Sequence, residues 1–440
     1  METILVIGAA RSGVAVARLL KEKGYSVLLT DLQVVNEKEQ LEQEEIQVFD
    51  QGHPESLKDK DYPFVVKNPG IPYTAPFIQY FVQKGTPIYT EIEVAYRFAP
   101  NFHYAAITGT DGKTTVTTLL YEMLQADKPA VVAGNIGIPL SEQVLQDDGK
   151  DKNVALELSN FQLLGTETFK AHVSTITNLA PDHMDYMDSL EEYYVSKMKI
   201  YENAGKEDYF IRNVDDPLIV KYAQNIPCQV IDFSLKRDDV DLYVKDGHIY
   251  YKDILLFEKK DLKIVGDFNC GNAMMAACMA YLLDTPLEAI QKVIASFTGV
   301  EHRIEYVDTI NGVRYYNDSK ATNTHSACAA LSAFEQPVIL LCGGKDKHLS
   351  FDDMKEYDQQ VKHCFSFGET KDAFKSIFTH QTSCDRMEQA FEMANKLAQE
   401  GDTILLSPAC SSFDQFKNYE VRGQEFKQLI AQYAKKGRSV

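Results

Sequence analysis

The sequence predicts an α/β protein built from three domains with parallel sheets. Short apolar runs with strand character alternate with helical patterns along most of the chain, as a parallel sheet requires. Glycine-rich or polar turns follow these runs, as they do at the carboxyl edge of such a sheet. A length of 440 residues exceeds what one hydrophobic core serves. We expect domains at residues 1–99, 100–299 and 300–440.

The first domain opens with a strand over Thr3–Ile7, the turn Gly8–Gly13 and a helix, followed by a second strand over Ser26–Thr30. Asp31 ends that strand at the position of a ribose-binding acid. This pattern resembles a dinucleotide fingerprint and predicts a Rossmann-like fold. Ala10 replaces the middle glycine, which weakens the case for NAD. A different bound nucleotide and a purely structural turn are the alternatives.

The second domain opens with an apolar strand that stops at Gly109, and a helical pattern begins near Lys113. A strand, a tight glycine turn and a helix N-terminus aim backbone N–H groups at a phosphate. We expect Lys113 to reach the terminal phosphates of ATP and the Thr114 or Thr115 hydroxyl to bind Mg²⁺. The loop is shorter than a standard phosphate loop, because Ile107 stands where the first glycine belongs. An ordinary turn with a surface lysine is the alternative.

Two further strands of this domain end in groups that bind metal ions. Glu157 lies near the end of one strand, and His183 follows another. We expect both on the same sheet edge as the phosphate loop, where a carboxylate and an imidazole suit Mg²⁺. Taken singly, each residue is more often a cap or a core polar group. Asn269 and Asn272, at the start of a later helix, are candidates for contacts to a base or ribose.

The third domain repeats the arrangement of polar clusters after apolar strands. Arg303, Lys320 and Lys347 all flank turns at strand ends, which predicts a second binding edge. A plain surface charge is the alternative for any one of them.

Composition excludes several classes of function. The formal net charge of −19 disfavours binding to nucleic acid and insertion into an anionic membrane. No stretch approaches a membrane span, and no signal peptide is evident. Eight cysteines without a CxxC pair favour a reducing cytoplasm over a zinc site or a disulfide framework. An anionic substrate therefore needs a locally basic site.

A set of motifs in order along nearly the whole chain resembles the Mur ligase family. They are GTDGKTT, GNIG, the strand end at Glu157, APDHMDYM, SKMKIYENA, GDFNCGNA, GVEHRIE, NDSKATN, LCGGKDK and SPACSSFDQFKNYEVRG. The resemblance implies a Rossmann-like domain for a UDP-sugar, a central ATPase domain and a dinucleotide-fold-like third domain. Two departures stand out: Asp111 where asparagine is usual, and Asn160 in place of a serine.

The resemblance also implies site residues. Lys113, His183 and Lys197 would be catalytic, with Lys197 carbamylated. The ATP-binding residues would be Gly109, Thr110, Asp111, Gly112, Lys113, Thr114, Thr115, Asn269, Asn272, Arg303, Asp318 and Lys320. Metal ligands would be Thr114, Glu157, His183 and Lys197. The UDP-sugar would contact Ser12, Asp31, Asn68, Gly70 and Asn135. The amino-acid substrate would contact Thr322, Lys347, Ser412, Phe413 and Tyr419.

The implied activity is ATP-dependent amide ligation through an acyl phosphate and a tetrahedral intermediate. The third-domain motifs favour addition of D-glutamate to UDP-N-acetylmuramoyl-L-alanine in peptidoglycan precursor synthesis, with ATP and two Mg²⁺ ions, by a cytoplasmic monomer. Addition of another amino acid by a sibling ligase is the first alternative. An NAD-dependent oxidoreductase and a nucleotide-gated binding protein without chemistry are the others.

Overall fold

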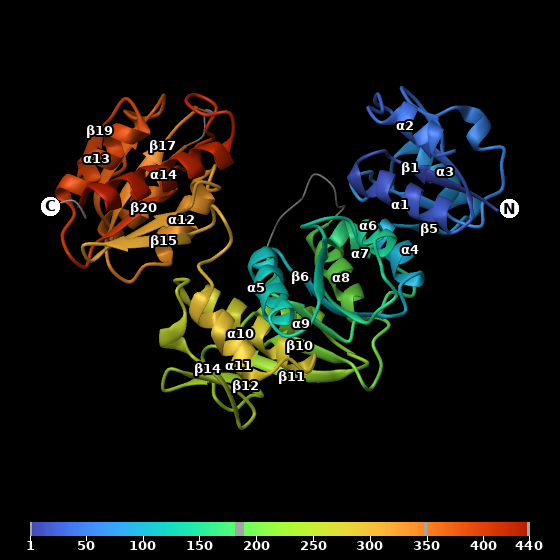
Figure 1. Ribbon diagram of the computed structural model, residues 1–440, viewed down its shortest axis with the longest axis horizontal. Helices are drawn as coiled ribbons and strands as arrows, with labels where there is room; N and C mark the ends of the chain where they lie inside the picture. The colour runs from blue at the N-terminus through green and yellow to red at the C-terminus, as the bar shows by residue number, and fades with distance from the viewer. Residues whose placement is uncertain (1, 181–188, 347–349, 438–440) are drawn as a thin grey trace. The chain divides into compact units, whose positions relative to one another are not determined.

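The computed structural model describes residues 2–180, 189–346 and 350–437. Figure 1 follows the chain from the N-terminal elements in blue to the C-terminal elements in red. The chain forms two compact units, one made of residues 1–257 with 272–293 and the other of residues 258–271 with 294–440. No helix within the three described ranges is both long and apolar enough to cross a membrane.

The N-terminal sheet has five parallel strands in the order β3-β2-β1-β4-β5. Neighbouring residues of β1 enter different cores: Ile4 and Val6 lie in one cluster, and Leu5 and Ile7 lie in another. This sheet is therefore buried on both faces, as parallel sheets are. Its elements are β1 (Thr3–Ile7), α1 (Arg11–Glu22), β2 (Ser26–Thr30), α2 (Lys38–Gln43), β3 (Gln47–Phe49), β4 (Val65–Lys67), α3 (Pro76–Lys84), β5 (Ile88–Tyr89) and α4 (Glu91–Arg97).

The central sheet has nine strands in the order β14-β13-β12-β11-β10-β9-β6-β8-β7. All pairings from β7 to β12 are parallel, and the antiparallel hairpin of β12 and β13 turns at Asp246-Gly247. Its strands are β6 (Phe102–Thr108), β7 (Ala130–Gly134), β8 (Lys152–Glu157), β9 (Val173–Ile176), β10 (Tyr209–Asn213), β11 (Gln229–Ser234), β12 (Leu242–Lys245), β13 (His248–Tyr251) and β14 (Ile254–Glu258). Its helices are α5 (Lys113–Gln125), α6 (Leu140–Leu145), α7 (Asn160–Leu163), α8 (Leu190–Met198), α9 (Pro217–Tyr222), α10 (Asp267–Leu282) and α11 (Leu287–Ser296).

The third sheet has six strands in the order β15-β16-β20-β17-β18-β19. The β15–β16 hairpin is antiparallel and turns at Asn311-Gly312, whereas the other pairings are parallel. Its elements are β15 (Glu305–Ile310), β16 (Val313–Asn317), α12 (Thr324–Ser332), β17 (Val338–Gly343), β18 (Val361–Phe367), β19 (Gln381–Ser383), α13 (Met387–Leu397), β20 (Thr403–Leu406) and α14 (Tyr419–Gly437). Short 3-10 helices lie at Glu55–Leu57, Lys199–Tyr201, Lys259–Asp261, Asp352–Gln360 and Ala373–Ser376.

The three sheets confirm the predicted α/β class with parallel sheets. Each sheet falls within one of the three predicted residue ranges. The boundaries at residues 99 and 299 stay a prediction.

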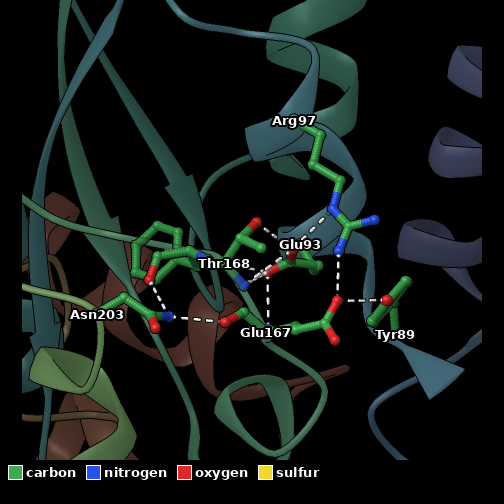
Figure 2. A network of polar contacts seen from close by, with 7 residues as sticks. Tyr89, Glu93, Arg97, Glu167, Thr168 and Asn203 are labelled. Carbon is green, nitrogen blue, oxygen red and sulfur yellow. Dashed lines mark hydrogen bonds and ion pairs between the residues drawn. The ribbon is translucent and has the colours of Figure 1, made fainter. Parts of the chain in front are cut away.

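A buried polar network joins helix α4 to the loop after α7 (Figure 2). The Glu93 carboxylate, with no exposed surface, accepts hydrogen bonds from the backbone N–H groups of Glu167, Thr168 and Phe169 at 2.9–3.1 Å. Arg97 donates to Glu93 and to Glu167 at 2.8 Å each. Because loop N–H groups and a guanidinium surround the Glu93 carboxylate, its charge is paired in spite of its burial. The network fixes the end of the N-terminal domain to the central sheet.

Candidate active site

The phosphate loop connects strand β6 to helix α5. Gly109 and Gly112 adopt φ angles of 144° and 78°. A Cβ atom on Gly109 would lie 2.0 Å from Thr177 Oγ1, so only glycine fits there. Gly112 is the N-cap of α5 and brings no side chain to the first N–H groups of the helix. The N-terminus of α5 thus has no side-chain cap from its N-cap residue, as in helices that bind an anion there.

Residues at the end of the neighbouring strand β9 support this loop. Asn178 Oδ1 accepts hydrogen bonds from the N–H groups of Thr110 at 3.2 Å and Asp111 at 2.8 Å. The Thr177 hydroxyl donates to the Asp111 carbonyl. Asn178 is not among the residues predicted from the sequence, although it follows a parallel strand, where binding groups gather. Thr110 and Asp111 thus hold the loop through their backbones, which fixes its shape before a nucleotide binds.

Two lysines converge on the carbonyl oxygen of Gly109. Lys113 Nζ donates to it at 2.9 Å and also to Thr110 O at 2.7 Å. Lys197 Nζ, from helix α8, donates to the same Gly109 oxygen at 3.0 Å and lies 4.4 Å from the centroid of the Tyr193 ring. Lys197 is only 2% exposed. Together with the positive end of α5, the Lys113 ammonium makes this loop a locally basic site in an acidic chain.

Glu157 lies at the end of β8, next to β6 in the sheet. Its Oε1 accepts a hydrogen bond from Asn135 Nδ2 at 2.7 Å, and its buried Oε2 has no partner among the described residues. A buried carboxylate oxygen without a donor suits a cation. Thr114 and Thr115, in the first turn of α5, are half-buried. His183 lies outside the described residues, within which no three His, Cys, Asp or Glu residues form a metal-binding group.

The strand ends of the first two sheets border one cavity of about 590 Å³. Four of the five predicted UDP-sugar residues line it together with both lysines: Ser12, Asn68, Gly70, Asn135, Lys113 and Lys197. Arg11 lies at the same cavity and donates to the Gly137 carbonyl at 2.7 Å. The cavity therefore brings a sugar-nucleotide loop and a phosphate loop into one space.

Asp31, the fifth predicted residue, borders a second cavity of about 580 Å³ in the N-terminal domain. Its carboxylate accepts hydrogen bonds from the N–H groups of Ala9 at 2.6 Å and Gln33 at 2.8 Å. His53, which the sequence analysis missed, stacks on Phe77 with 4.3 Å between ring centroids. Burial lowers the pKa of His53, so its ring is neutral at pH 7. A flat apolar wall beside a carboxylate suits a nucleoside.

The two predicted asparagines belong to the start of α10. Asn272 is 5% exposed, and a Cβ atom on Gly112 would lie 2.6 Å from its Oδ1. The structure thus places Asn272 against the phosphate loop, as expected for a nucleotide contact. Asn269 is also buried, and its Nδ2 donates to Val265 O at 2.8 Å.

The third sheet carries the predicted acidic group at the end of β16. The Asp318 carboxylate accepts hydrogen bonds from Ser407 Oγ at 2.8 Å and from Ile304 N at 3.2 Å. Burial raises the pKa of Asp318 to about 7, against these bonds and the charges of Arg303 and Arg422. Arg303 itself is exposed, and Lys320 Nζ lies 5.7 Å from the centroid of the Tyr419 ring. Asp318 thus lies in the same strand-end region as Arg303, one of the three cations predicted at such turns.

The predicted amino-acid residues lie on neighbouring loops of this sheet. Lys345 N donates to Ser411 O at 2.9 Å, which joins the loop after β17 to the loop after β20. Ser412 is buried, Phe413 is 69% exposed, and Thr322 and Tyr419 are half-buried. Lys347 lies outside the described residues. An exposed aromatic ring beside a buried hydroxyl is consistent with a binding edge and does not test the individual roles.

Arg422, in helix α14, is a structural residue that the sequence analysis missed. Its guanidinium has no exposed surface and donates to Ser319 Oγ, Ser319 O and Cys410 O at 2.8–3.0 Å. Burial lowers its pKa to about 10, so it stays charged at pH 7. Arg422 thereby connects the loop that carries Asp318 to the loop that carries Ser412. Its place in the quoted VRG motif was the only sequence signal.

A glycine phosphate loop on a parallel sheet, flanked by two lysines and a buried glutamate, defines a nucleotide-dependent enzyme. The sequence model of the Mur ligase middle domain matches residues 107–280, and that of the Mur ligase glutamate ligase domain matches residues 302–410. The chain belongs to the Mur ligase family. These matches confirm the family that the sequence motifs indicated.

Curated relatives match over nearly the full length. The UDP-N-acetylmuramoylalanine–D-glutamate ligase of Bacillus subtilis is 41% identical over 433 residues, which cover 96% of each chain. The protein of the same name from Geobacillus kaustophilus is 42% identical over 434 residues, again 96% of each chain.

Solved structures share the fold at lower identity. A pseudomurein peptide ligase type C from Methanothermus fervidus has a TM-score of 0.56 at 19% identity and covers 98% of this chain and 100% of its own. A UDP-N-acetylmuramate-alanine ligase from Thermotoga maritima has a TM-score of 0.55 at 18% identity, and the match covers 98% of this chain and 99% of the other.

Proposed function

We propose that this protein joins D-glutamate to UDP-N-acetylmuramoyl-L-alanine with hydrolysis of ATP to ADP and phosphate, in peptidoglycan precursor synthesis. The observation that carries the proposal is the identity of about 40% over 96% of the chain to ligases of that name. The cavity that joins the N-terminal loops to the phosphate loop supports it, because acceptor and ATP must meet there. The cytoplasm is the proposed location, since the precursor's nucleotide substrates are found there.

The chemistry follows from the groups at the cavity. The acceptor carboxylate is a poor acylating agent, so ATP converts it to an acyl phosphate by phosphoryl transfer, which depends on positioning and charge. Lys113 and the N–H groups at the start of α5 hold the transferring phosphoryl group and offset the negative charges that meet there. The amine of glutamate then attacks the acyl carbon. The tetrahedral intermediate collapses to the amide and releases phosphate.

Mg²⁺ fits the residues present at the phosphate loop. The buried Glu157 Oε2 without a donor, the Thr114 hydroxyl and, from the sequence, His183 would hold it. When bound, Mg²⁺ supplies positive charge to the phosphate oxygens. Asn135 keeps the Glu157 carboxylate in place through its hydrogen bond to Oε1. A second Mg²⁺ ion is part of the proposal, and a carbamate on Lys197 would be its candidate ligand.

We further propose that Lys197 carries a carbamate. Its amine is buried against Tyr193 and Gly109, and burial favours the neutral amine that reacts with CO₂. Carbamylation turns a cation into an anion, which suits a metal ligand. A ¹³C-carbamate signal after exchange with labelled bicarbonate, absent from Lys197→Ala, is the expected result. A protein that binds nucleotide and Mg²⁺ with an unmodified Lys197 contradicts it.

The amino-acid site is proposed on the third sheet. Glutamate brings two carboxylates, and Ser412, Thr322 and Lys347 offer a cation and hydroxyl donors to them. Phe413 and Tyr419 would pack against its methylene groups. No motif places an acid for the distal amine of a diamino acid. Lys347→Ala should raise the glutamate requirement about 10- to 100-fold, from a charge-assisted bond worth roughly 1.5–3 kcal/mol.

The decisive experiment measures phosphate release with UDP-N-acetylmuramoyl-L-alanine, ATP and an equal concentration of D-Glu, L-Glu, L-Ala, L-Lys or diaminopimelate. We expect turnover with D-Glu and dependence on all three substrates. Preference for a diamino acid or L-alanine indicates a sibling ligase. Hydride transfer with NAD, or nucleotide binding without turnover, indicates one of the remaining alternatives.

A further inference from the structure

A buried lysine lies beneath the N-terminal loop that borders both cavities. Lys67, the last residue of β4, is 1% exposed. Its Nζ donates to the carbonyls of Asn68 at 3.3 Å, Pro69 at 3.4 Å and Ile71 at 2.8 Å. It also lies 4.6 Å from the centroid of the Tyr73 ring. No acidic side chain forms an ion pair with it among the described residues, so its charge is balanced by carbonyl dipoles and an aromatic face.

The loop above Lys67 is a tight turn from Asn68 to Ile71. Ile71 N donates to Asn68 O at 3.0 Å, and Gly70 N donates to Asn68 Oδ1 at 3.0 Å. Asn68 Nδ2 donates to Ser12 Oγ at 3.1 Å, which ties the turn to the start of α1. The turn thus presents Asn68 to both cavities and Gly70 to the larger one.

The three carbonyls that Lys67 holds point into the protein. A carbonyl oxygen facing the cavity would repel the phosphates of a nucleotide, whereas an inward carbonyl leaves them the second N–H of the Asn68 side-chain amide, whose first donates to Ser12 Oγ. The ammonium also places a fixed positive charge beneath this wall in a medium of low dielectric constant. Burial is costly for a charge, and three hydrogen bonds offset part of that cost.

We propose that Lys67 is a positioning residue for the UDP portion of the acceptor, which it serves by holding the Asn68–Ile71 turn in its binding shape. This inference rests on the proposed function for the identity of the acceptor. It assigns to Lys67 no contact with the substrate and no part in phosphoryl transfer.

The role of Lys67 can also be tested by raising the pH until its amine loses its charge. Burial lowers the pKa of Lys67 to about 8, so the amine loses its charge within an accessible range. The titratable side chain in contact with it is Tyr73, whose pKa burial raises to about 12 and which stays neutral there. Elsewhere on the cavity wall, His53 has a lowered pKa and is neutral from pH 7 upward. The phosphates of UDP keep a constant charge in this range, since their last pKa is about 6.

The experiment compares the wild type with Lys67→Met, which keeps the length of the side chain but removes its donors and charge. We expect the KM for the UDP-sugar and the Kd for UDP alone to rise about 10-fold, with kcat and the KM values for ATP and D-glutamate within about twofold of wild type. In the wild type, the Kd for UDP should rise as pH passes about 8. In Lys67→Met it should stay flat.

Lys84→Met is the matched control, because Lys84 lies on α3 of the same domain and pairs with Asp61 at the surface. A folded Lys67→Met protein with wild-type UDP affinity overturns the inference. Should that variant not fold, a wild-type Kd for UDP that is constant from pH 7 to 8.8, a range in which the uracil ring of UDP stays neutral, overturns it as well. Wild-type turnover with D-glutamate tests the proposed function separately, whatever Lys67 does.

Discussion

Lys113 is held by its own loop. Its hydrogen bonds to Gly109 and Thr110 place the ammonium over the loop, where the proposed function puts the transferring phosphoryl group. The preorganised charge lowers the barrier because little rearrangement is needed during the reaction.

Lys113→Ala should therefore reduce kcat by at least about 100-fold, the scale for one such electrostatic contact. The far-UV circular dichroism should not change, because the substitution keeps a helix-forming residue at the start of α5. The measurement is steady-state phosphate release, with exposed Lys150→Ala as the control. Near-normal turnover of Lys113→Ala would show that Lys113 does not bind the transferring phosphoryl group.

At the scale of elements, α4 fixes the N-terminal domain to the central sheet through two buried acids. Glu93 accepts hydrogen bonds from three backbone N–H groups and from Arg97, as Figure 2 shows. Glu91, the first residue of the helix, accepts from Ser141 N at the beginning of α6. The junction is thus polar although its surroundings are apolar.

Glu93→Ala should lower the free energy of unfolding by about 3–5 kcal/mol, because it leaves Arg97 and the buried N–H groups without their acceptor. Glu167→Ala removes the exposed acid of the same network and should cost less than about 1 kcal/mol. Urea unfolding of both variants provides the measurement. Equal losses would show that the buried carboxylate is not the centre of the network.

Glu91 makes the stability of the junction depend on pH. Burial raises the pKa of Glu91 in the folded protein to about 7 from an ordinary value of 4.5. The contribution of protonated Glu91 to the free energy of unfolding is therefore complete below pH 4.5 and is lost as pH rises through 7. Glu91→Gln, which cannot ionise, should gain about 1–3 kcal/mol of stability relative to wild type between pH 5 and pH 8. If the difference in unfolding free energy between Glu91→Gln and wild type is the same at pH 5 and at pH 8, the raised pKa of Glu91 is contradicted.

At the scale of the molecule, binding groups lie at the carboxyl ends of the strands in all three sheets. The candidate UDP and phosphate groups belong to one compact unit, and the candidate glutamate groups belong to the other. Each substrate should therefore leave its own signature on the stability of the chain.

UDP at 100 times its Kd should stabilise the unit that binds it by about 2.7 kcal/mol. Hydrogen exchange followed by mass spectrometry should show slower exchange in residues 1–99, around the turn at Asn68 and the strand end at Asp31. Residues 305–346 should exchange at unchanged rates. If UDP slowed hydrogen exchange only in the third sheet, the proposed UDP site in the N-terminal domain would be wrong.

Much of the fold and of the candidate site could be predicted from the sequence, because the patterns that predict them involve residues close together in the chain. The turn after Ile7 and the glycines at 109 and 112 follow from neighbouring residues, and the structure has them where expected. Parallel pairing then places Glu157 and the phosphate loop on one edge.

The missed residues act over long distances along the chain. Arg422 bonds to Ser319, 103 positions away, and Glu93 accepts from a loop more than 70 positions away. In the sequence, Lys67 resembles any lysine at the end of a strand, and only the structure shows that its side chain is buried. Such residues need the folded backbone, since no spacing rule encodes which loops meet.

The β12–β13 hairpin has a practical consequence. Its turn at Asp246-Gly247 is exposed, and three strands, β11, β10 and β9, separate β12 from β6 and the phosphate loop. A Cβ atom on Gly247 would meet no atom within 4 Å. This turn is therefore the place to insert a peptide tag or a fluorophore, so that the enzyme can be tethered to a sensor chip while its substrate cavities stay open.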